Sequence, residues 1–263
     1  MGEMTTHSGD NVLRCSDLSV RVPGRILVER LTLEIRPGKV LAILGRNGTG
    51  KSSTLHTLAG LRSAAGGGIT LGGTALVRWS RREVARRVAL LPQVNDDPFP
   101  ATALEAVMVG RHPHLDFWAS ETATDLEIAR RCLATVDLAS FGSRDVTTLS
   151  GGERRRLAAA TVLAQDPQTY LLDEPIQHLD PQHQMDVLGI FRGLADAGRA
   201  VALSLHDVGL AARFADEALL LFGDGRWQHG PSDKVLNETS IGALYGMPVR
   251  ELRWPHGRTF VAA

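Results

Sequence analysis

One stretch of eight residues constrains the fold of this chain more than any other part of the sequence. It reads Gly45-Arg46-Asn47-Gly48-Thr49-Gly50-Lys51-Ser52, which has the spacing G-x-x-x-x-G-K-[ST]. Residues 40–44 form a short apolar run that predicts a buried strand, and residues 53–61 carry apolar side chains at helical spacing. A strand, a glycine-rich loop and a helix in this order are the context that a phosphate-binding loop requires.

The chemistry of such a loop follows from its backbone. Glycines allow the chain to curl so that successive N–H groups face an anion, and the helix that follows presents its positive end to the same anion. Lys51 is expected to place a charge on the outer phosphates, and Ser52 to ligate Mg²⁺. The chain has only three lysines, Lys39, Lys51 and Lys234, and one of them occupies the required position. The alternative is a glycine-rich turn that happens to precede a helix.

The length and charge of the chain narrow the classes of protein to consider. Its 263 residues can bury a full core, as one large domain or as a core with a subdomain. A formal net charge of zero argues against a nucleic-acid partner held by a basic surface. Residues 1–10 are polar and resemble a loose tail rather than a signal peptide, and no apolar run approaches the ~18 residues of a membrane span. Cys15 and Cys132 lie far apart in sequence, which predicts two reduced, packed thiols in a cytosolic protein.

Apolar runs alternate with helical patterns along most of the chain. Strands are expected at residues 12–22, 26–35, 40–44, 69–71, 88–91, 169–173, 200–204 and 218–222, and helices at residues 53–61, 81–87, 104–109, 121–136, 152–164, 181–197 and 207–214. The alternation predicts an α/β fold with a mainly parallel, covered sheet. We expect a single domain over residues 1–263, with its core in residues 1–93 and 166–263 and a helical insertion in residues 94–165. Residues 249–263 form a short tail of mixed pattern.

Two acidic residues follow the apolar run at residues 169–172. An aspartate at the carboxyl end of such a strand faces the ligand crevice of an open α/β sheet, so Asp173 can hold Mg²⁺ through its water shell. Glu174 follows directly and can orient or deprotonate an attacking water. The alternative is a pair of solvated carboxylates at a strand end.

A second glycine motif precedes a long helical pattern. Ser150, Gly151, Gly152 and Glu153 stand at the expected start of the helix, where backbone N–H groups can bind an anion. An ordinary capping box, with Ser150 as the N-cap and Glu153 three residues later, explains the same residues locally. Only the presence of the other motifs in the same chain favours the anion site.

These pieces, in this order, resemble the ATP-binding-cassette (ABC) ATPases, and the resemblance covers nearly the whole chain. The corresponding motifs are the Walker A loop at residues 45–52, the Q-loop glutamine Gln93, the signature motif at residues 149–153, the Walker B strand with its catalytic glutamate at residues 170–174, the D-loop at Leu179 and Asp180, and the switch histidine His206. The resemblance implies a P-loop NTPase core with a mainly parallel sheet, an antiparallel β subdomain and a helical subdomain.

The resemblance also implies a composite site. ATP would lie on the Walker A loop of one copy and be capped by the signature motif of a second copy, so that a head-to-tail dimer holds two sites. The residues expected to bind ATP are Gly45, Asn47, Gly48, Gly50, Lys51, Ser52 and Ser53, and those expected to act from the second copy are Ser150, Gly151, Gly152 and Glu153. Asp180 would communicate across the interface between the copies.

The catalytic roles come from the same resemblance. Glu174 would act on the attacking water, His206 would contact the γ-phosphate, and Gln93 would sense Mg²⁺ and water. The expected Mg²⁺ ligands are Ser52, Gln93 and Asp173. Catalysis of this kind consists mainly of positioning and of charge stabilisation at the transferred phosphoryl group.

Two positions depart from the family pattern. Val22, flanked by Arg21 and Arg25, stands where the family often has an aromatic residue that stacks on adenine. Ile176 and Gln177 replace the small hydroxyl residue and the Asn or Ser that usually follow Walker B, which predicts an altered dimer contact. We expect ATP hydrolysis to survive both departures.

The segment Val109–His114 resembles one branch of the family. Its Gly-Arg-x-Pro-His pattern is similar to that of the ATPase subunits of importers for iron-siderophores, haem and cobalamin. The overall resemblance, rather than any single residue, makes haem the first choice of cargo. The implied partners are a dimeric membrane permease and, indirectly, a periplasmic binding protein, with the chain held peripherally at the cytoplasmic face of the bacterial inner membrane. A metal site at His112 and His114 is the alternative, but the spacing does not suit one helix face and Pro113 is expected to break the helix.

Three rival functions stay open. One is a soluble ABC ATPase of iron–sulfur cluster assembly, against which the pattern at residues 110–114 argues. Another is a cassette protein of translation or DNA repair, although such proteins carry a second cassette or a long coiled-coil insertion. The third is a binding subunit without hydrolysis, against which Lys51, Asp173, Glu174 and His206 argue.

Overall fold

A computed structural model of the chain describes residues 12–93, 100–115, 121–255 and 257–263. The expected tail at residues 1–10 and the first part of the expected helical insertion, residues 94–99, lie outside the described residues. The strands are β1 (Leu13–Val22), β2 (Arg25–Ile35), β3 (Val40–Leu44), β4 (Gly66–Leu71), β5 (Thr74–Ala75), β6 (Val88–Leu91), β7 (Thr169–Leu172), β8 (Ala200–Leu205), β9 (Glu217–Leu221), β10 (Trp227–Pro231), β11 (Val249–Trp254) and β12 (Gly257–Ala262). The α-helices are α1 (Lys51–Leu58), α2 (Arg81–Ala85), α3 (Ala103–Met108), α4 (Ala123–Thr135), α5 (Gly151–Gln165), α6 (Pro181–Asp196), α7 (Val208–Phe214), α8 (Ser232–Val235) and α9 (Glu238–Tyr245).

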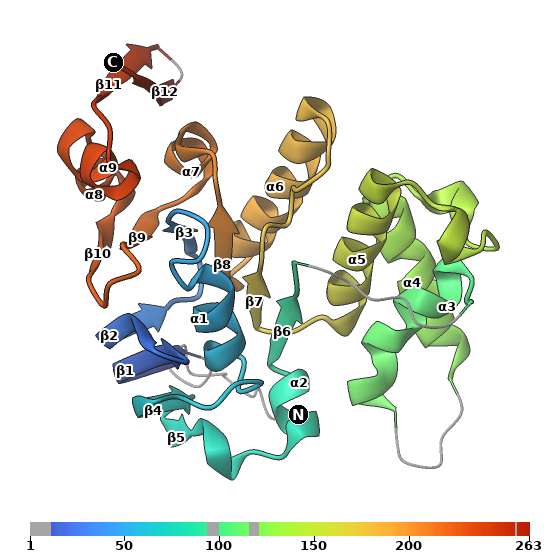
Figure 1. Cartoon of the computed structure of the whole chain (residues 1–263). Coiled ribbons are helices and arrows are strands. Elements are labelled where there is room, and N and C mark those ends of the chain that lie inside the picture. The colour runs from blue at the N-terminus through green and yellow to red at the C-terminus, as the bar shows by residue number, and fades with distance from the viewer. Residues whose placement is uncertain (1–11, 94–99, 116–120, 256) are drawn as a thin grey trace, which may run out of the picture.

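A six-stranded sheet forms the centre of the molecule (Figure 1). Its order is β10-β9-β3-β8-β7-β6, and every neighbouring pair is parallel except β9 with β10 at the edge. The register brings the strand ends level, since Leu44 of β3 pairs with Leu205 of β8 and Leu91 of β6 pairs with Leu172 of β7. The predicted α/β fold with a mainly parallel sheet is confirmed.

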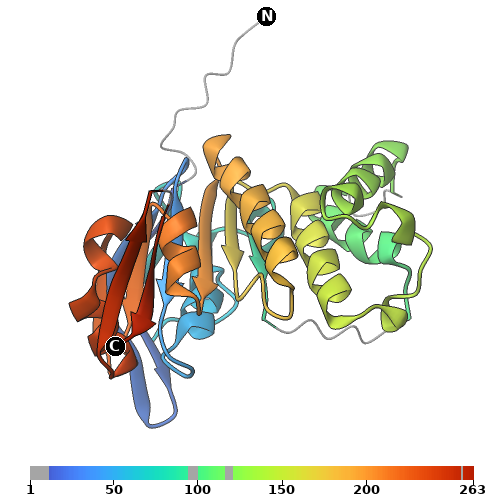
Figure 2. The same cartoon turned by 90° about the horizontal axis from the view of Figure 1, so that it is seen from above.

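Alternate residues of the central strands enter two separate cores. Val40, Ala42 and Leu44 pack on the face that α6 and α7 cover, whereas Leu41 and Ile43 pack on the face covered by α1 and by the antiparallel sheet β2-β1-β4-β5 (Figure 2). Strands buried on both faces need apolar side chains at every position, which explains the continuous apolar runs in the sequence.

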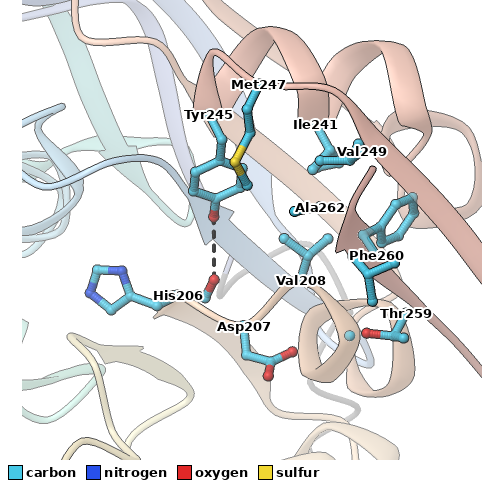
Figure 3. A pocket seen from close by; sticks show the side chains of 12 residues that line it. His206, Asp207, Val208, Ile241, Tyr245, Met247, Val249, Thr259, Phe260 and Ala262 are labelled. Atoms are coloured by element: carbon cyan, nitrogen blue, oxygen red, sulfur yellow. Dashed lines mark hydrogen bonds between the residues drawn. The ribbon is translucent and has the colours of Figure 1, made fainter.

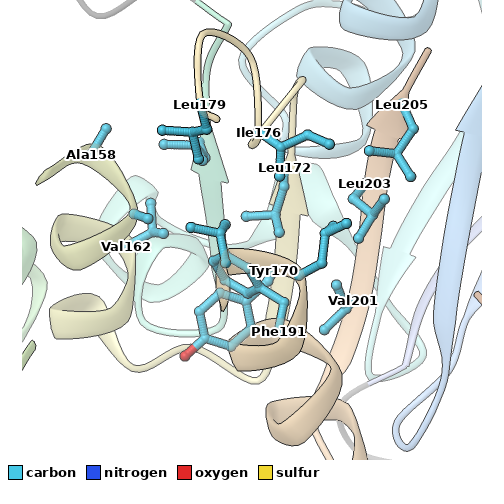
Figure 4. Packing of buried hydrophobic residues seen from close by; sticks show 14 of the residues in the cluster. Ala158, Val162, Tyr170, Leu172, Ile176, Leu179, Phe191, Val201, Leu203 and Leu205 are labelled. Carbon is cyan, nitrogen blue, oxygen red and sulfur yellow. The ribbon is translucent and has the colours of Figure 1, made fainter. Parts of the chain in front are cut away.

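Aromatic packing joins β7 to α6. Tyr170 and Phe191 are both buried and meet edge to face, with ring centroids 5.7 Å apart, inside the apolar cluster that Figure 4 shows. Ile176 belongs to the same buried cluster. The side chain of Ile176 thus fills the core of its own chain, and the altered dimer contact expected from Ile176 and Gln177 stays a prediction.

Helices form one end of the molecule, to the right in Figures 1 and 2. Within the described residues, every α-helix and 3₁₀ turn from Thr102 to Gln165 belongs to this part, and α5 packs against α3 and α4. The structure thus agrees with the expected run of helices between β6 and β7. The division of the chain into a core and a helical subdomain stays a prediction.

The segment Val109–His114 is a 3₁₀ helix, η2, that directly continues α3. The expectation that Pro113 breaks the helix is wrong, because the 3₁₀ turn includes this proline. Gly110 lies so close to α5 that an added Cβ would approach the Thr161 carbonyl oxygen to 2.2 Å. His114 Nε2 lies 2.8 Å from the Gln165 carbonyl oxygen, and no group of three potential metal ligands exists among the described residues. The segment therefore has a packing role in this fold.

Arg111 of the same segment joins two further helices. Its Nε donates to Asp125 Oδ1 at 2.9 Å near the start of α4, and its terminal nitrogen donates to the Ala164 carbonyl oxygen at 2.8 Å near the end of α5. Both charged side chains are largely buried. Hydrogen bonds from Thr122 and Arg111 lower the pKa of Asp125 to about 2. An ion pair of this geometry fixes the helices of this end relative to one another.

The last forty residues are more regular than the sequence patterns indicate. Strand β10 and helices α8 and α9 lead into a hairpin of β11 and β12, in which Val249 pairs with Ala262 and Trp254 pairs with Gly257. The expected mixed tail is therefore an antiparallel hairpin. Its alternation is weak because Leu252 and Trp254 are half exposed, so the strand lacks one clearly apolar face.

Two smaller findings complete the fold. No helix in the described part of the chain is long and apolar enough to cross a membrane. Cys15 is buried and Cys132 half-buried, both as free thiols, and burial raises their pKa values to about 12 and about 11. Such thiols are poor nucleophiles at neutral pH.

We expect Arg111→Met to destabilise the helical end by about 3 kcal/mol near pH 7, because it leaves a buried carboxylate without its cation. Asp125 has a folded pKa of about 2 against an ordinary value of 3.8, so its stabilisation is present above about pH 4 and is lost as the pH falls towards 2. The difference in unfolding free energy between wild type and variant, measured in urea by circular dichroism, should narrow from pH 7 to pH 3. Arg130→Met, an exposed change on α4, is the control. An equal difference at both pH values would contradict the role of the ion pair.

Candidate nucleotide-binding and catalytic site

Four loops gather at one edge of the central sheet. Residues 45–50 follow β3, Asp173 and Glu174 follow β7, His206 follows β8, and Gln93 is the second residue after β6. Because β3, β8, β7 and β6 are parallel neighbours in this order, their carboxyl ends lie side by side. The sheet topology therefore brings together segments that are separated by more than a hundred residues in sequence.

The loop at residues 45–50 can be built only with glycine at its two ends. A Cβ on Gly45 would lie 2.4 Å from Thr49 Oγ1 and 2.7 Å from the Leu221 carbonyl oxygen. Gly50 has a φ of 106°, and a Cβ there would lie 2.9 Å from Leu27 Cβ. These constraints wrap the backbone tightly around the start of α1.

The start of α1 offers unpaired donors. Gly50 is the N-cap and provides no side-chain cap, and the first turn contains no acidic residue. The first N–H groups of a helix have no partner within the helix, and they carry its positive partial charge. Lys51, Ser52 and Ser53 form this turn, so the expected phosphate-binding residues lie where an anion would be stabilised.

Lys51 is a buried cation beside this turn. Its side chain is 5% exposed, and Nζ donates to the Gly45 carbonyl oxygen at 2.9 Å. Burial lowers the pKa of Lys51, and the nearby charges of Glu174 and Asp173 partly oppose that shift. A phosphate would supply the negative charge that favours the ammonium form.

Asp173 is completely buried at the end of β7. Its Oδ1 accepts a hydrogen bond from Ser204 Oγ at 2.7 Å, whereas Oδ2 is buried without a hydrogen-bond partner among the described residues. A buried carboxylate oxygen without a partner is costly, and a cation or its ordered water would satisfy it. The residue therefore fits the expected Mg²⁺ site.

Glu174 is the centre of the predicted catalytic group. Gln93 Nε2 donates to Glu174 Oε2 at 3.0 Å, and His206 Nε2 lies 2.6 Å from Oε1. The side chain is 6% exposed, and the backbone has a φ of 49°, in the left-handed region that non-glycine residues rarely adopt. All three residues expected to be catalytic thus meet at one carboxylate.

An open cavity of about 410 Å³ covers this region. The residues lining it are Val22, Arg25, Leu27, Asn47, Gly48, Gly50, Lys51, Ser52, Ser53, Gln93, Glu174, Gln177 and His206. Nine of the predicted site residues belong to this set, together with Val22 at the position expected for the base. Gln177, noted above as a departure, faces the cavity. Arg25 Nε donates to the Gly223 carbonyl oxygen at 2.9 Å, which fixes its guanidinium at the rim.

The signature residues and Asp180 do not line this cavity. Ser150 caps α5 through the capping box, since its Oγ accepts from the Glu153 N–H at 3.2 Å and Glu153 Oε2 accepts from the Ser150 N–H at 2.7 Å. Asp180 caps α6 and also pairs with His183, whose ring Nδ1 lies 2.7 Å from Oδ2. Within a single chain, Ser150 and Glu153 therefore form the ordinary capping box that was the alternative to an anion site.

Two residues of the site are not predicted from the sequence. Ser204 links the Walker B residues, because its hydroxyl donates to Asp173 and accepts from the Glu174 N–H at 2.8 Å. Arg155 on α5 reaches the backbone of both residues from the other side. A polar residue inside the apolar run of β8 is a signal for Ser204, whereas nothing distinguishes Arg155 from its neighbours Arg154 and Arg156.

The C-terminal hairpin packs close to the switch histidine. A cavity of about 250 Å³ lies between the start of α7, α9 and β12, with an apolar lining that includes Val208 and Phe260 (Figure 3). Tyr245 donates its hydroxyl to the His206 carbonyl oxygen at 3.2 Å, while the imidazole points away from this cavity. Tyr245 at the end of α9 thus holds the backbone of His206, and the His206 ring faces Glu174.

Comparisons with known proteins show the family of this chain. The profile of the family described as ABC transporter matches residues 28–177. The chain is 40% identical to the hemin import ATP-binding protein HmuV of Pseudomonas fluorescens (strain Pf0-1), over 90% of this chain and 94% of that protein. It is 39% identical to the protein of the same name from Gloeobacter violaceus, over 93% of this chain and 90% of that protein. The chain belongs to the ABC transporter family. It is an ATPase of this family and binds ATP.

Solved structures show the same fold. A metal-chelate type ABC transporter in an inward-facing conformation superimposes with a TM-score of 0.83 and 25% identity, over 96% of this chain and 98% of that chain. A nucleotide-free ATP-binding cassette superimposes with a TM-score of 0.74 and 19% identity, over 90% and 96% of the two chains. The P-loop NTPase fold implied by the motifs of this ATPase is confirmed.

We expect Val22→Tyr to tighten ATP binding about tenfold, because stacking of a base on an aromatic side chain contributes about 1–3 kcal/mol. Val22 faces the same cavity as the phosphate loop, so the new ring can reach the base. The measurement is the dissociation constant of a fluorescent ATP analogue. Val77→Tyr is the control, since Val77 is 93% exposed and does not line the cavity. An unchanged dissociation constant in Val22→Tyr would show that the base lies elsewhere.

Proposed function

We propose that this chain is the ATP-hydrolysing subunit of an importer for haem or a related iron or cobalt chelate. The single observation that supports hydrolysis is that Gln93 and His206 both contact the Glu174 carboxylate, beside the phosphate loop. The choice of cargo is supported by relatives from several organisms that bear the name hemin import ATP-binding protein, and by one named cobalamin import ATP-binding protein from Halobacterium salinarum.

In this proposal the residues of one chain prepare the water and the phosphate. Glu174 accepts a proton from the attacking water or orients it, and the water oxygen bonds to the γ-phosphorus while the bond to ADP breaks. Lys51 and the first turn of α1 hold the phosphate oxygens, and His206 contacts the γ-phosphate. Because the transition state carries charge on those oxygens, fixed donors lower its energy more than that of the ground state.

Mg²⁺ would be held by Ser52, Gln93 and Asp173. The unpartnered Oδ2 of Asp173 is consistent with this ion or with a water bound to it. When bound, Mg²⁺ neutralises charge on the β- and γ-phosphates. Ser204 positions Asp173 for that contact through the 2.7 Å hydrogen bond to the other carboxylate oxygen.

The site would be completed by a second copy of the chain. Ser150, Gly151, Gly152 and Glu153 lie at the start of a fifteen-residue helix whose N-terminal dipole suits an anion, yet they do not line the cavity of their own chain. A head-to-tail dimer would place them over the partner's nucleotide. Asp180, exposed at the start of α6, would contact the partner across that interface.

Residues 94–165 would act as a helical subdomain that transmits the nucleotide state. Gln93 joins this part to the site through its bond to Glu174, so changes at the phosphate can be passed to the helices. In this arrangement a dimeric membrane permease docks on the helical end, and a periplasmic binding protein delivers the chelate to the permease. The chain would then lie peripherally at the cytoplasmic face of the bacterial inner membrane.

We expect Glu174→Gln to keep ATP binding while hydrolysis falls at least about a hundredfold, since the amide cannot accept the proton of the attacking water. The measurements are phosphate release at saturating ATP and the ATP dissociation constant. Glu127→Gln, an exposed change on α4, is the matched control and should hydrolyse ATP as wild type does. Wild-type turnover in Glu174→Gln would exclude this residue as the base.

The importer assignment predicts a specific partner. When the chain is expressed with a permease of a haem importer from the same organism, the two should co-purify from detergent. Haem should then stimulate ATP hydrolysis in liposomes that contain this complex and the binding protein. Stimulation by a siderophore or cobalamin instead would change the cargo and keep the importer. Co-purification with a soluble iron–sulfur scaffold, and with no permease, would overturn the proposal.

A further inference from the structure

Arg155 is a buried cation that lies between the two halves of the catalytic machinery. It is the fifth residue of α5, the helix that begins directly after Ser150, and its side chain is 7% exposed. Every hydrogen bond that the structure gives this guanidinium goes to a backbone carbonyl oxygen. The carbonyl groups belong to two loops that come from β6 and β7.

The contacts are short and form a fork. On the β7 side, Nε lies 3.1 Å and one terminal nitrogen 2.7 Å from the Glu174 carbonyl oxygen, and the same terminal nitrogen also donates to the Asp173 carbonyl oxygen. On the β6 side, the other terminal nitrogen lies 2.6 Å from the Pro92 and 3.3 Å from the Gln93 carbonyl oxygen. Only a planar guanidinium has enough donors in a fixed geometry to bind four carbonyl groups.

The charge of Arg155 is retained despite its burial. Burial lowers the pKa to about 10, and the charges of Asp173 and Glu174 favour the cation. A buried charge without a directly paired carboxylate is costly, so packing alone is a poor reason for an arginine here. Its hydrogen bonds instead fix the backbone at the two residues whose side chains meet in the site.

The effect on Glu174 is specific. Its backbone has a φ of 49°, a strained conformation that a non-glycine residue keeps only when the surrounding structure imposes it. Ser204 accepts from its N–H at 2.8 Å, and Arg155 donates to its carbonyl oxygen, so the residue is held on both sides. The same guanidinium holds the carbonyl of Gln93, whose side chain binds the Glu174 carboxylate at 3.0 Å.

We propose that Arg155 is a positioning residue that sets the geometry of Glu174 and Gln93 and ties it to the placement of α5. The proposal rests on the function proposed above, in which the start of α5 contacts the nucleotide of a second copy. A shift of α5 on forming that contact moves the Arg155 backbone, and the guanidinium passes the movement to Glu174 of its own chain. One site is thereby made sensitive to closure at the other.

The test compares Arg155→Gln and Arg155→Lys with Arg154→Gln as the control. Arg154 is the neighbouring residue on α5. Its side chain is exposed and donates to the Thr147 carbonyl oxygen, away from the loops that follow β6 and β7. The measurements are kcat and KM for ATP, the ATP dissociation constant and the melting temperature. We expect Arg155→Gln to lower kcat by about 10- to 100-fold with KM within about threefold of wild type, because the phosphate loop is untouched. Arg155→Lys should recover part of kcat, since one ammonium can bind some of the four carbonyl groups.

Each outcome separates the inference from the proposed function. If wild type and Arg154→Gln do not hydrolyse ATP, the proposed function fails. If they do, and Arg155→Gln has wild-type kcat, only the positioning role is overturned. A loss in kcat matched by a rise in KM and a large fall in melting temperature would show a merely structural role. If Arg155→Gln does not fold, Arg155→Lys decides: a folded variant with reduced kcat and unchanged KM supports the inference, and wild-type kcat overturns it.

Discussion

The burial of two adjacent carboxylates at the end of β7 is the constraint on which the site depends. Asp173 is fully buried and Glu174 nearly so. Neither carboxylate would be stable there without groups that compensate for its lost hydration. The structure supplies them from different elements: the Ser204 hydroxyl from β8, the Lys51 charge from α1 and the Arg155 guanidinium from α5. A core built only from apolar side chains could not have held these anions beside a phosphate.

The sequence predicts the parts of this arrangement that are local. The phosphate loop, the apolar run of β7 and the helix after Ser150 are short-range patterns, so they indicate both the fold and most of the site residues. Contacts between segments far apart in sequence are different. The pairing of Ser204 with Asp173 and of Tyr245 with His206 depends on the order of strands in the sheet and on the path of the C-terminal segment, neither of which a local pattern specifies.

The Gly110-Arg111 motif, through which the chain resembles one branch of the family, has a physical role in the fold. Gly110 allows η2 to approach α5 closely, and Arg111 joins α4 to α5 through Asp125 and a carbonyl group. These contacts shape the helical end that would meet a permease, although none of these side chains needs to touch the cargo. In the proposed function, the motif would mark a branch of the family through the form of the end that meets the permease.

Two connections join the helical end to Glu174, the predicted catalytic base, and both involve Gln93 and Glu174. One is the chain itself, which leaves β6 through Gln93 and enters the helices. The other is α5, which begins at the signature motif and reaches Glu174 through Arg155. Because Gln93 and Glu174 also bind each other, the two connections and this hydrogen bond form a closed ring. We infer that a displacement of the helical end would be passed through this ring to the hydrogen bonds of Glu174. In the proposed function, coupling between docking and hydrolysis would rest on the connectivity of this ring, without a separate moving part.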